Sequence, residues 1–195
     1  MAEQVPLTTD EQALPTVAGQ KTQPPLPRDE RLMATVAVAL ASFMHGVDLA
    51  VTNVSVPAIA GNLGGSLTQG TWAITSYAVA SAIVIPLTGW LTTRFGQVRV
   101  FVSSVLMFTL ASMLCGLSTS LEMLVLARTL QGLTSGPMTP VAMSLLLAAY
   151  PPNKAAIAMT IAMMTAMISP VVGPLLGGWI TDNLSWPWIF YVNLP

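Results

Sequence analysis

Long apolar runs separated by short polar breaks dominate this chain. Five runs follow one another, and each approaches or exceeds the ~20 residues that an α-helix needs to cross a hydrocarbon core about 30 Å thick. They cover residues 32–57, 71–91, 98–117, 121–148 and 155–181. No run shows the strict alternation that is typical of outer-membrane barrel strands. The pattern therefore predicts an all-α, polytopic helical membrane protein with about five transmembrane helices.

Residues 1–31 have a different composition. They hold five prolines among polar neighbours and show no apolar period. Such a segment buries too little surface to offset the entropy lost on ordering, so we expect it to be disordered. It lacks the basic start and short apolar core of a cleaved secretory signal, which makes the first apolar run an uncleaved signal anchor. The chain thus divides into a cytoplasmic tail, 1–31, and a transmembrane part, 32–195.

Composition narrows the classes of function. Charged residues make up 8% of the chain and hydrophobic residues 53%, against roughly 25% charged in soluble domains. The net charge of -1 comes without a basic block, which argues against a nucleic-acid partner. His45 is the only histidine and Cys115 the only cysteine, so no nucleophile-base-acid set, cysteine metal cluster or internal disulfide is available. We therefore expect neither an enzyme nor a metal protein.

The basic residues indicate how the helices are oriented. If the N-terminus is cytoplasmic, every Lys and Arg except Arg128 falls on the cytoplasmic side, and the opposite side receives only the acids Glu122 and Asp182. These basic residues are Lys21, Arg28, Arg31, Arg94, Arg99 and Lys154. The positive-inside rule then predicts a multi-pass protein of the inner, cytoplasmic membrane with a cytoplasmic N-terminus.

Tryptophan positions agree with this orientation. Trp72, Trp179, Trp186 and Trp188 fall near the outer ends of the runs, and Trp90 falls near an inner end. Aromatic belts of membrane proteins place tryptophan at these two interfaces. We therefore expect all five side chains at the membrane surfaces.

Two charged residues, Asp48 and Arg128, lie deep inside the apolar runs, and we expect them to be candidates for an ion pair. At 1.5 Å per residue, Asp48 lies roughly 24 Å above Leu32, and Arg128 lies about 10 Å below Leu121, so the two are at similar depth. A buried charge in a span usually has a partner and a function. His45 is three positions before Asp48, and Gln131 is three positions after Arg128, which gives each charge a polar neighbour on its own helix face.

Five motifs give the chain a resemblance to a known family. They are Asp48–Pro57 (D-x-x-x-x-N-x-x-x-P), Gly89–Gly96, Arg128–Gly132, Gly173–Gly178 and the tryptophan-rich stretch Trp186–Pro195. In this order they resemble the fourteen-helix drug/proton antiporters of the major facilitator superfamily, of the EmrB/QacA type. The resemblance covers nearly everything after residue 31.

The resemblance implies roles for the buried polar residues. It implies that Asp48 carries the coupled proton, that Arg128 changes the proton affinity of this acid, and that Asn53 belongs to the same polar motif. Physical chemistry agrees, because burial disfavours a charged carboxylate whereas a nearby guanidinium favours it. His45 and Gln131 are supporting polar residues in this interpretation. A purely structural ion pair remains the alternative.

Two further motifs imply moving parts. Gly89, Arg94 and Gly96 match the cytoplasmic gating loop of the superfamily, although Thr93 stands where many members have an acid; positive-inside anchoring by Arg94 is the alternative. The second motif matches the one that distinguishes antiporters, and its residues are Gly173, Pro174, Gly177 and Gly178. Proline bends a helix and glycines separated by three residues allow close helix contact, so a static kink is the alternative here.

The function that the resemblance implies is proton-coupled export of hydrophobic or cationic drugs, without a cofactor beyond the proton gradient. The lipid bilayer and small hydrophobic drugs are the expected partners. A periplasmic adaptor and an outer-membrane channel are implied as partners. Because this family has fourteen helices, we expect the chain to be an N-terminal fragment, truncated before helix six. The alternative is a non-transporting remnant or a membrane scaffold protein.

Overall fold

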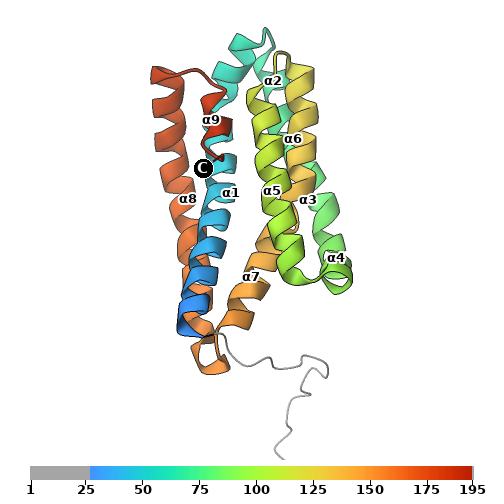
Figure 1. Ribbon diagram of the computed structural model, residues 1–195. Helices are drawn as coiled ribbons and strands as arrows, with labels where there is room; N and C mark the ends of the chain where they lie inside the picture. The colour runs from blue at the N-terminus through green and yellow to red at the C-terminus, as the bar shows by residue number, and fades with distance from the viewer. Residues whose placement is uncertain (1–26, 195) are drawn as a thin grey trace, which may run out of the picture.

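The computed structural model describes residues 27–194, and this part of the chain forms a bundle of upright helices (Figure 1). Five helical segments are long and apolar enough to cross a membrane, which confirms the expected number. They are α1 (Arg28–Asn62), the segment Leu67–Phe95, α5 (Gln97–Gly116), the segment Leu121–Ala149 and α8 (Ala155–Asn183). A short helix, α9 (Trp188–Tyr191), follows the last of them.

The first helix is longer at both ends than the apolar run suggests. It begins at Arg28, inside the segment 1–31 that we expected to be a tail; residues 1–26 of that tail lie outside the described residues. Asp29 and Glu30 lie in the first turn, where carboxylates interact favourably with the helix dipole. At the other end, α1 continues through Pro57 to Asn62.

The second and fourth spans are each interrupted. In the second, the short α2 (Leu67–Gly70) precedes α3 (Trp72–Val84), and the 3-10 turn η1 (Ile85–Leu87) then separates α3 from α4 (Thr88–Phe95). In the fourth, a Gly-Pro pair separates α6 (Leu121–Ser135) from α7 (Met138–Ala149). Proline lacks the N–H of the helix ladder and its ring clashes with the preceding turn, which explains both breaks. As a result α7 slants away from α6 (Figure 1).

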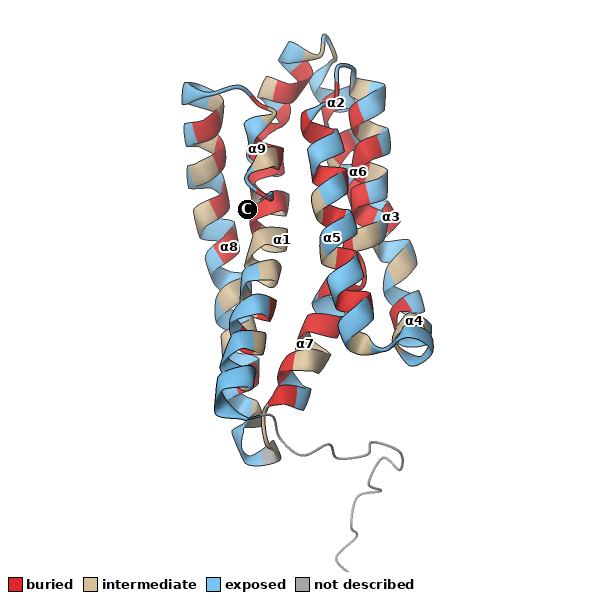
Figure 2. Cartoon of the chain, in the orientation of Figure 1, coloured by how far each residue is buried: buried red, intermediate tan, exposed pale blue. Residues whose placement is uncertain are grey.

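The helices pack in pairs that are distant in sequence. α1 runs along α8, α3 runs along α6, and α5 packs on the other side of α6 (Figure 1). Buried residues lie mostly on the helix faces turned toward the bundle interior, and exposed residues on the outer faces (Figure 2). Many large apolar side chains are among the exposed residues. Met167, Val171 and Leu175 on α8 are 65–75% exposed, which suits a surface that faces lipid.

Glycines set the closest helix contacts. A Cβ on Gly132 of α6 would collide with the backbone carbonyl of Tyr77, and a Cβ on Gly136 would lie 2.9 Å from the carbonyl oxygen of Ser81. The backbones of α3 and α6 therefore touch along this row, as the Gly-x-x-x-Gly spacing predicts.

The glycines of the antiporter motif form a second contact row. A Cβ on Gly173 would collide with Ala50 of α1, and one on Gly177 would lie 3.3 Å from the Cα of Val51. Gly178, by contrast, faces open space. Gly89 of the gating-loop motif is exposed on α4 and likewise has no atom within 4 Å of its Cβ direction.

Apart from Arg128, the basic residues of the described helices gather at one end of the bundle. Arg28 and Arg31 begin α1, Arg94 and Arg99 flank the α4–α5 turn, and Lys154 precedes α8. These three points lie at the same end, next to the start of the chain (Figure 1). The arrangement matches the grouping by which the positive-inside rule orients membrane proteins.

The segment after α8 does not stay at the bundle end. It turns back and descends between α8 and α5, so that α9 packs inside the bundle (Figure 1). The side chain of Trp186 is only 8% exposed and belongs to the buried cluster with Ile189 and Phe190. The prediction of an interfacial position was therefore wrong for Trp186, because burial against protein outweighs the preference of tryptophan for the membrane surface.

Substitutions in the antiporter motif should distinguish the effect of a close helix contact from the effect of replacing a glycine in a helix. Gly173→Ala is expected to cost about 1–3 kcal/mol, because its methyl group meets the Cβ of Ala50 in a close helix contact. Gly178→Ala is the matched control, with open space around its Cβ. Thermal unfolding of the protein in detergent should show a lower midpoint for the first variant only; equal losses would contradict this contact.

Candidate functional site

A buried ion pair joins α1 to α6 in the part of the bundle away from the basic end. Nη1 of Arg128 lies 2.7 Å from Oδ2 of Asp48, and the two side chains are 0% and 1% exposed. The similar depths of the two residues allowed this contact, and the structure makes it. In a medium of low dielectric constant the attraction is strong, but both charges have lost their hydration and need further partners.

Gln131 connects both members of the pair. Its Oε1 accepts a hydrogen bond from Nη1 of Arg128 at 2.7 Å, and its Nε2 donates to Oδ1 of Asp48 at 3.1 Å. Cys115 of α5 also donates to this Oε1, with the sulfur 3.4 Å away. Because Gln131 is one turn beyond Arg128 on α6, the helix itself brings the amide to the carboxylate.

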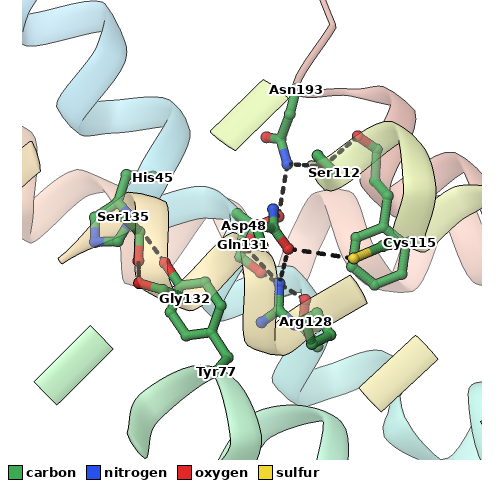
Figure 3. Close-up of polar contacts among 12 residues, drawn as sticks. His45, Asp48, Tyr77, Ser112, Cys115, Arg128, Gln131, Gly132, Ser135 and Asn193 are labelled. Atoms are coloured by element: carbon green, nitrogen blue, oxygen red, sulfur yellow. Dashed lines mark hydrogen bonds and ion pairs between the residues drawn. The ribbon is translucent and has the colours of Figure 1, made fainter. Parts of the chain in front are cut away.

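Asn193 reaches the same carboxylate from the segment after α8. Its Nδ2 donates to Oδ1 of Asp48 at 2.6 Å and to Oγ of Ser112 at 2.9 Å (Figure 3). The hydroxyl of Ser112 in turn donates to the backbone carbonyl of Phe190 at 2.9 Å. Sequence reasoning gave neither Asn193 nor Ser112 a role at this site, although Asn193 lies in the tryptophan-rich motif.

The guanidinium of Arg128 is held by groups other than Asp48 as well. Its Nε donates to the backbone carbonyl of Ala73 at 3.3 Å. The guanidinium carbon lies 4.3 Å from the centroid of the Tyr77 ring and 5.6 Å from that of Phe190. Stacking on aromatic faces stabilises a desolvated cation. The close contact at Gly132 is what lets α3 bring Tyr77 over Arg128.

His45 lies at the edge of the site and contacts Tyr77 instead of Asp48. Its Nδ1 is 3.0 Å from the Tyr77 hydroxyl, and its ring meets Phe108 edge-on with centroids 5.9 Å apart. The tautomer of His45 decides which partner donates in the bond to Tyr77. A link therefore runs from a partly exposed imidazole through Tyr77 to Arg128.

Asn53, expected as a supporting polar residue, lies outside the site. It is exposed and makes no side-chain hydrogen bond within residues 27–194. Five helical residues correspond to a rotation of about 500°, so Asn53 lies about 140° around α1 from Asp48. Thr52 instead turns its hydroxyl back to the carbonyl of Asp48 at 2.7 Å.

The residues matched to the gating loop lie far from the ion pair. Arg94 and Gly96 are exposed at the α4–α5 turn, at the basic end of the bundle. Gly96 has a φ of 87°, a left-handed conformation that favours glycine. Within the described residues, the only ion pair is that of Asp48 and Arg128, so Arg94 has no acidic partner there.

The antiporter motif does reach the site, but through the backbone of α1. Gly173 and Gly177 pack against Ala50 and Val51, which follow Asp48 within one turn. Any shift of this turn of α1 is therefore felt directly by α8. The motif supports the turn that carries the carboxylate, and its own residues do not touch the ion pair.

Known membrane transporters resemble this chain in sequence. The family model described as Major Facilitator Superfamily matches residues 38–195. The multidrug export protein EmrB of Escherichia coli K12 is 50% identical over 173 residues, which is 89% of this chain and 34% of that protein. The fatty acid resistance protein FarB of Neisseria gonorrhoeae is 48% identical over 172 residues, 88% of this chain and 34% of that protein. The chain thus spans about a third of the length of these curated relatives.

Solved structures show the same arrangement of helices. A bacterial homologue of the human lysosomal transporter Spinster, inward-facing and unoccupied, superposes with a TM-score of 0.70 over 87% of this chain and 40% of that one, at 22% identity. A peptide transporter of the POT type, in complex with sulfate, gives a TM-score of 0.71 over 85% of this chain and 35% of that one, at 16% identity. At these identities the likeness concerns the fold.

Removing one charge of the pair should be more harmful than removing both. Arg128→Met leaves Asp48 buried without its cation and is expected to cost about 3–5 kcal/mol. Asp48→Asn combined with Arg128→Met should recover most of this loss, because no unpaired charge remains in the core. Unfolding of the four proteins in a double-mutant cycle measures the coupling; a double variant as unstable as Arg128→Met alone would contradict this account.

Proposed function

The chain belongs to the Major Facilitator Superfamily of membrane transporters, and from this we propose that it supplies the N-terminal helices of a proton-coupled drug exporter. The observation that carries the proposal is the fully buried pair of Asp48 and Arg128. An acid inside a membrane bundle is costly and usually takes part in ion or proton movement. The pair joins α1 to α6, so a change in its charge acts on the contact between these two helices.

Proton binding at Asp48 would change the forces on Arg128. A protonated carboxyl group no longer attracts the guanidinium, so the strongest bond between α1 and α6 becomes a weak one. Arg128 retains the carbonyl of Ala73, the amide oxygen of Gln131 and the Tyr77 ring. The guanidinium of Arg128 therefore stays buried and bound while Asp48 changes charge. When this guanidinium lies close to Asp48, it opposes protonation of the carboxylate.

The contact between α1 and α8 would pass this change to the rest of the carrier. Ala50 and Val51, just after Asp48 on α1, lie against Gly173 and Gly177, so only small side chains separate the two backbones. Transporters of this kind expose a midplane site alternately to the two sides by moving helix bundles against each other. In our proposal the antiporter motif is the packing interface that couples proton binding to this movement.

Export would use the proton gradient across the inner membrane, with the basic end of the bundle and the N-terminus in the cytoplasm. Each proton that moves inward down a potential of 100 mV supplies about 2.3 kcal/mol. Similarity to proteins named for multidrug export supports hydrophobic or cationic compounds as substrates. A periplasmic adaptor and an outer-membrane channel are proposed as partners, by the same similarity.

Neutralising the acid should abolish coupled transport without preventing insertion. In the complete natural protein, Asp48→Asn is expected to reduce dye export driven by a pH gradient in inverted membrane vesicles to background, because no carboxylate remains to bind the proton. Glu122→Gln is the matched control, since it removes an exposed acid in the first turn of α6. Export that persists in Asp48→Asn at similar protein levels would overturn the proposal.

A further inference from the structure

The hydrogen bonds around Asp48 are unequally divided between its two oxygens. Oδ1 accepts two, from Nε2 of Gln131 and Nδ2 of Asn193, whereas Oδ2 accepts one, from Nη1 of Arg128. A carboxylate has about four lone-pair sites, two on each oxygen. Both sites on Oδ1 are therefore filled, and Oδ2 keeps one that has no protein donor within residues 27–194.

The amide of Gln131 is unable to turn over. Its Oε1 accepts from Nη1 of Arg128, and arginine has only donors to offer. Rotating the amide would point an NH₂ group at this donor, so the oxygen stays beside Arg128. The nitrogen is then held toward Oδ1 of Asp48.

The amide of Asn193 is fixed by a different chain of bonds. The single hydroxyl hydrogen of Ser112 is given to the carbonyl of Phe190, which only accepts. Ser112 must therefore accept from Asn193, and the nitrogen of Asn193 must face it. The second hydrogen of this nitrogen then points at Oδ1 of Asp48, as Figure 3 shows. A protonated Oδ1 would place its own hydrogen against two fixed donors.

We propose that Asn193 is a positioning residue that directs the incoming proton to Oδ2 of Asp48, the oxygen bonded to Arg128. This rests on the function proposed above. The step adds one proton to the carboxylate at Oδ2 and gives a neutral carboxyl group. The two hydrogen bonds at Oδ1 stay in place. Protonation then competes with the ion pair itself, because the hydrogen and Arg128 share one oxygen. By directing the proton to Oδ2, the segment after α8 causes proton binding to weaken the contact between α1 and α6.

Other titratable groups near Asp48 come from four helices. They are His45 on α1, Tyr77 on α3, Cys115 on α5 and Arg128 on α6. α7 has no titratable side chain, the one acid of α8 is Asp182 in its last turn, and Tyr191 of α9 packs against Gly116 instead. Of these titratable groups only Arg128 bonds to the carboxylate. Its other two donors are the amide side chains of Gln131 and Asn193.

Infrared difference spectra between high and low pH test the proposal on the complete protein in lipid. The carbonyl band of protonated Asp48 is identified by its loss in Asp48→Asn. If the proton is on Oδ2, the carbonyl oxygen is Oδ1, which accepts two hydrogen bonds and absorbs at low wavenumber. Asn193→Ala removes one of them, so the band should move to higher wavenumber.

Two further variants make the test specific. Ser112→Ala keeps Asn193 but frees its amide to turn, so it should shift the band in the same direction by a smaller amount. Val192→Ala, in the same segment and partly exposed, should leave the band unchanged. A band that Asn193→Ala does not move would overturn this inference alone, because the carbonyl would then be Oδ2. Absence of any Asp48 band would overturn it together with the proposed function.

Discussion

The cost of burying two opposite charges in a membrane protein governs the structure around Asp48 and Arg128. Neither side chain is exposed, so every bond that water would have made has to come from the protein. The surrounding residues provide it: two amides and a guanidinium for the carboxylate, and a carbonyl, an amide oxygen and two rings for the cation. The bundle is thus assembled around a polar centre as well as an apolar core.

This polar centre also explains which helices must be in register. α1 and α6 bring the charges, α3 brings the Tyr77 ring, and α5 brings Ser112, which aligns the segment after α8. Glycine rows at α3–α6 and at α1–α8 keep the backbones close enough for these short side chains to meet. A displacement of one helix would break bonds that belong to several others, so the network favours a small number of discrete arrangements.

Much of this could be predicted from the sequence, and the remainder depends on tertiary packing. The lengths of the apolar runs gave the spans, and equal depth gave Asp48 and Arg128 as partners. Motif spacing failed for Asn53, because it ignores the rotation of the helix. The aromatic-belt rule failed for Trp186, because the chain turns back into the bundle and buries this side chain. The bond between Asp48 and Asn193 joins residues 145 positions apart, and no local pattern signals such a contact.

The breaks in the second and fourth spans divide the bundle along its length. The halves away from the basic end, α3 and α6, hold Arg128 and the Tyr77 ring, whereas the halves at the basic end, α4 and α7, are attached through η1 and a Gly-Pro junction. Such joints are the most compliant points of the two rods. A torque applied at the basic end is therefore taken up as bending at the joints before it strains the salt bridge. The basic end is able to move on these joints while the ion pair holds the opposite end in place, for as long as the carboxylate stays charged.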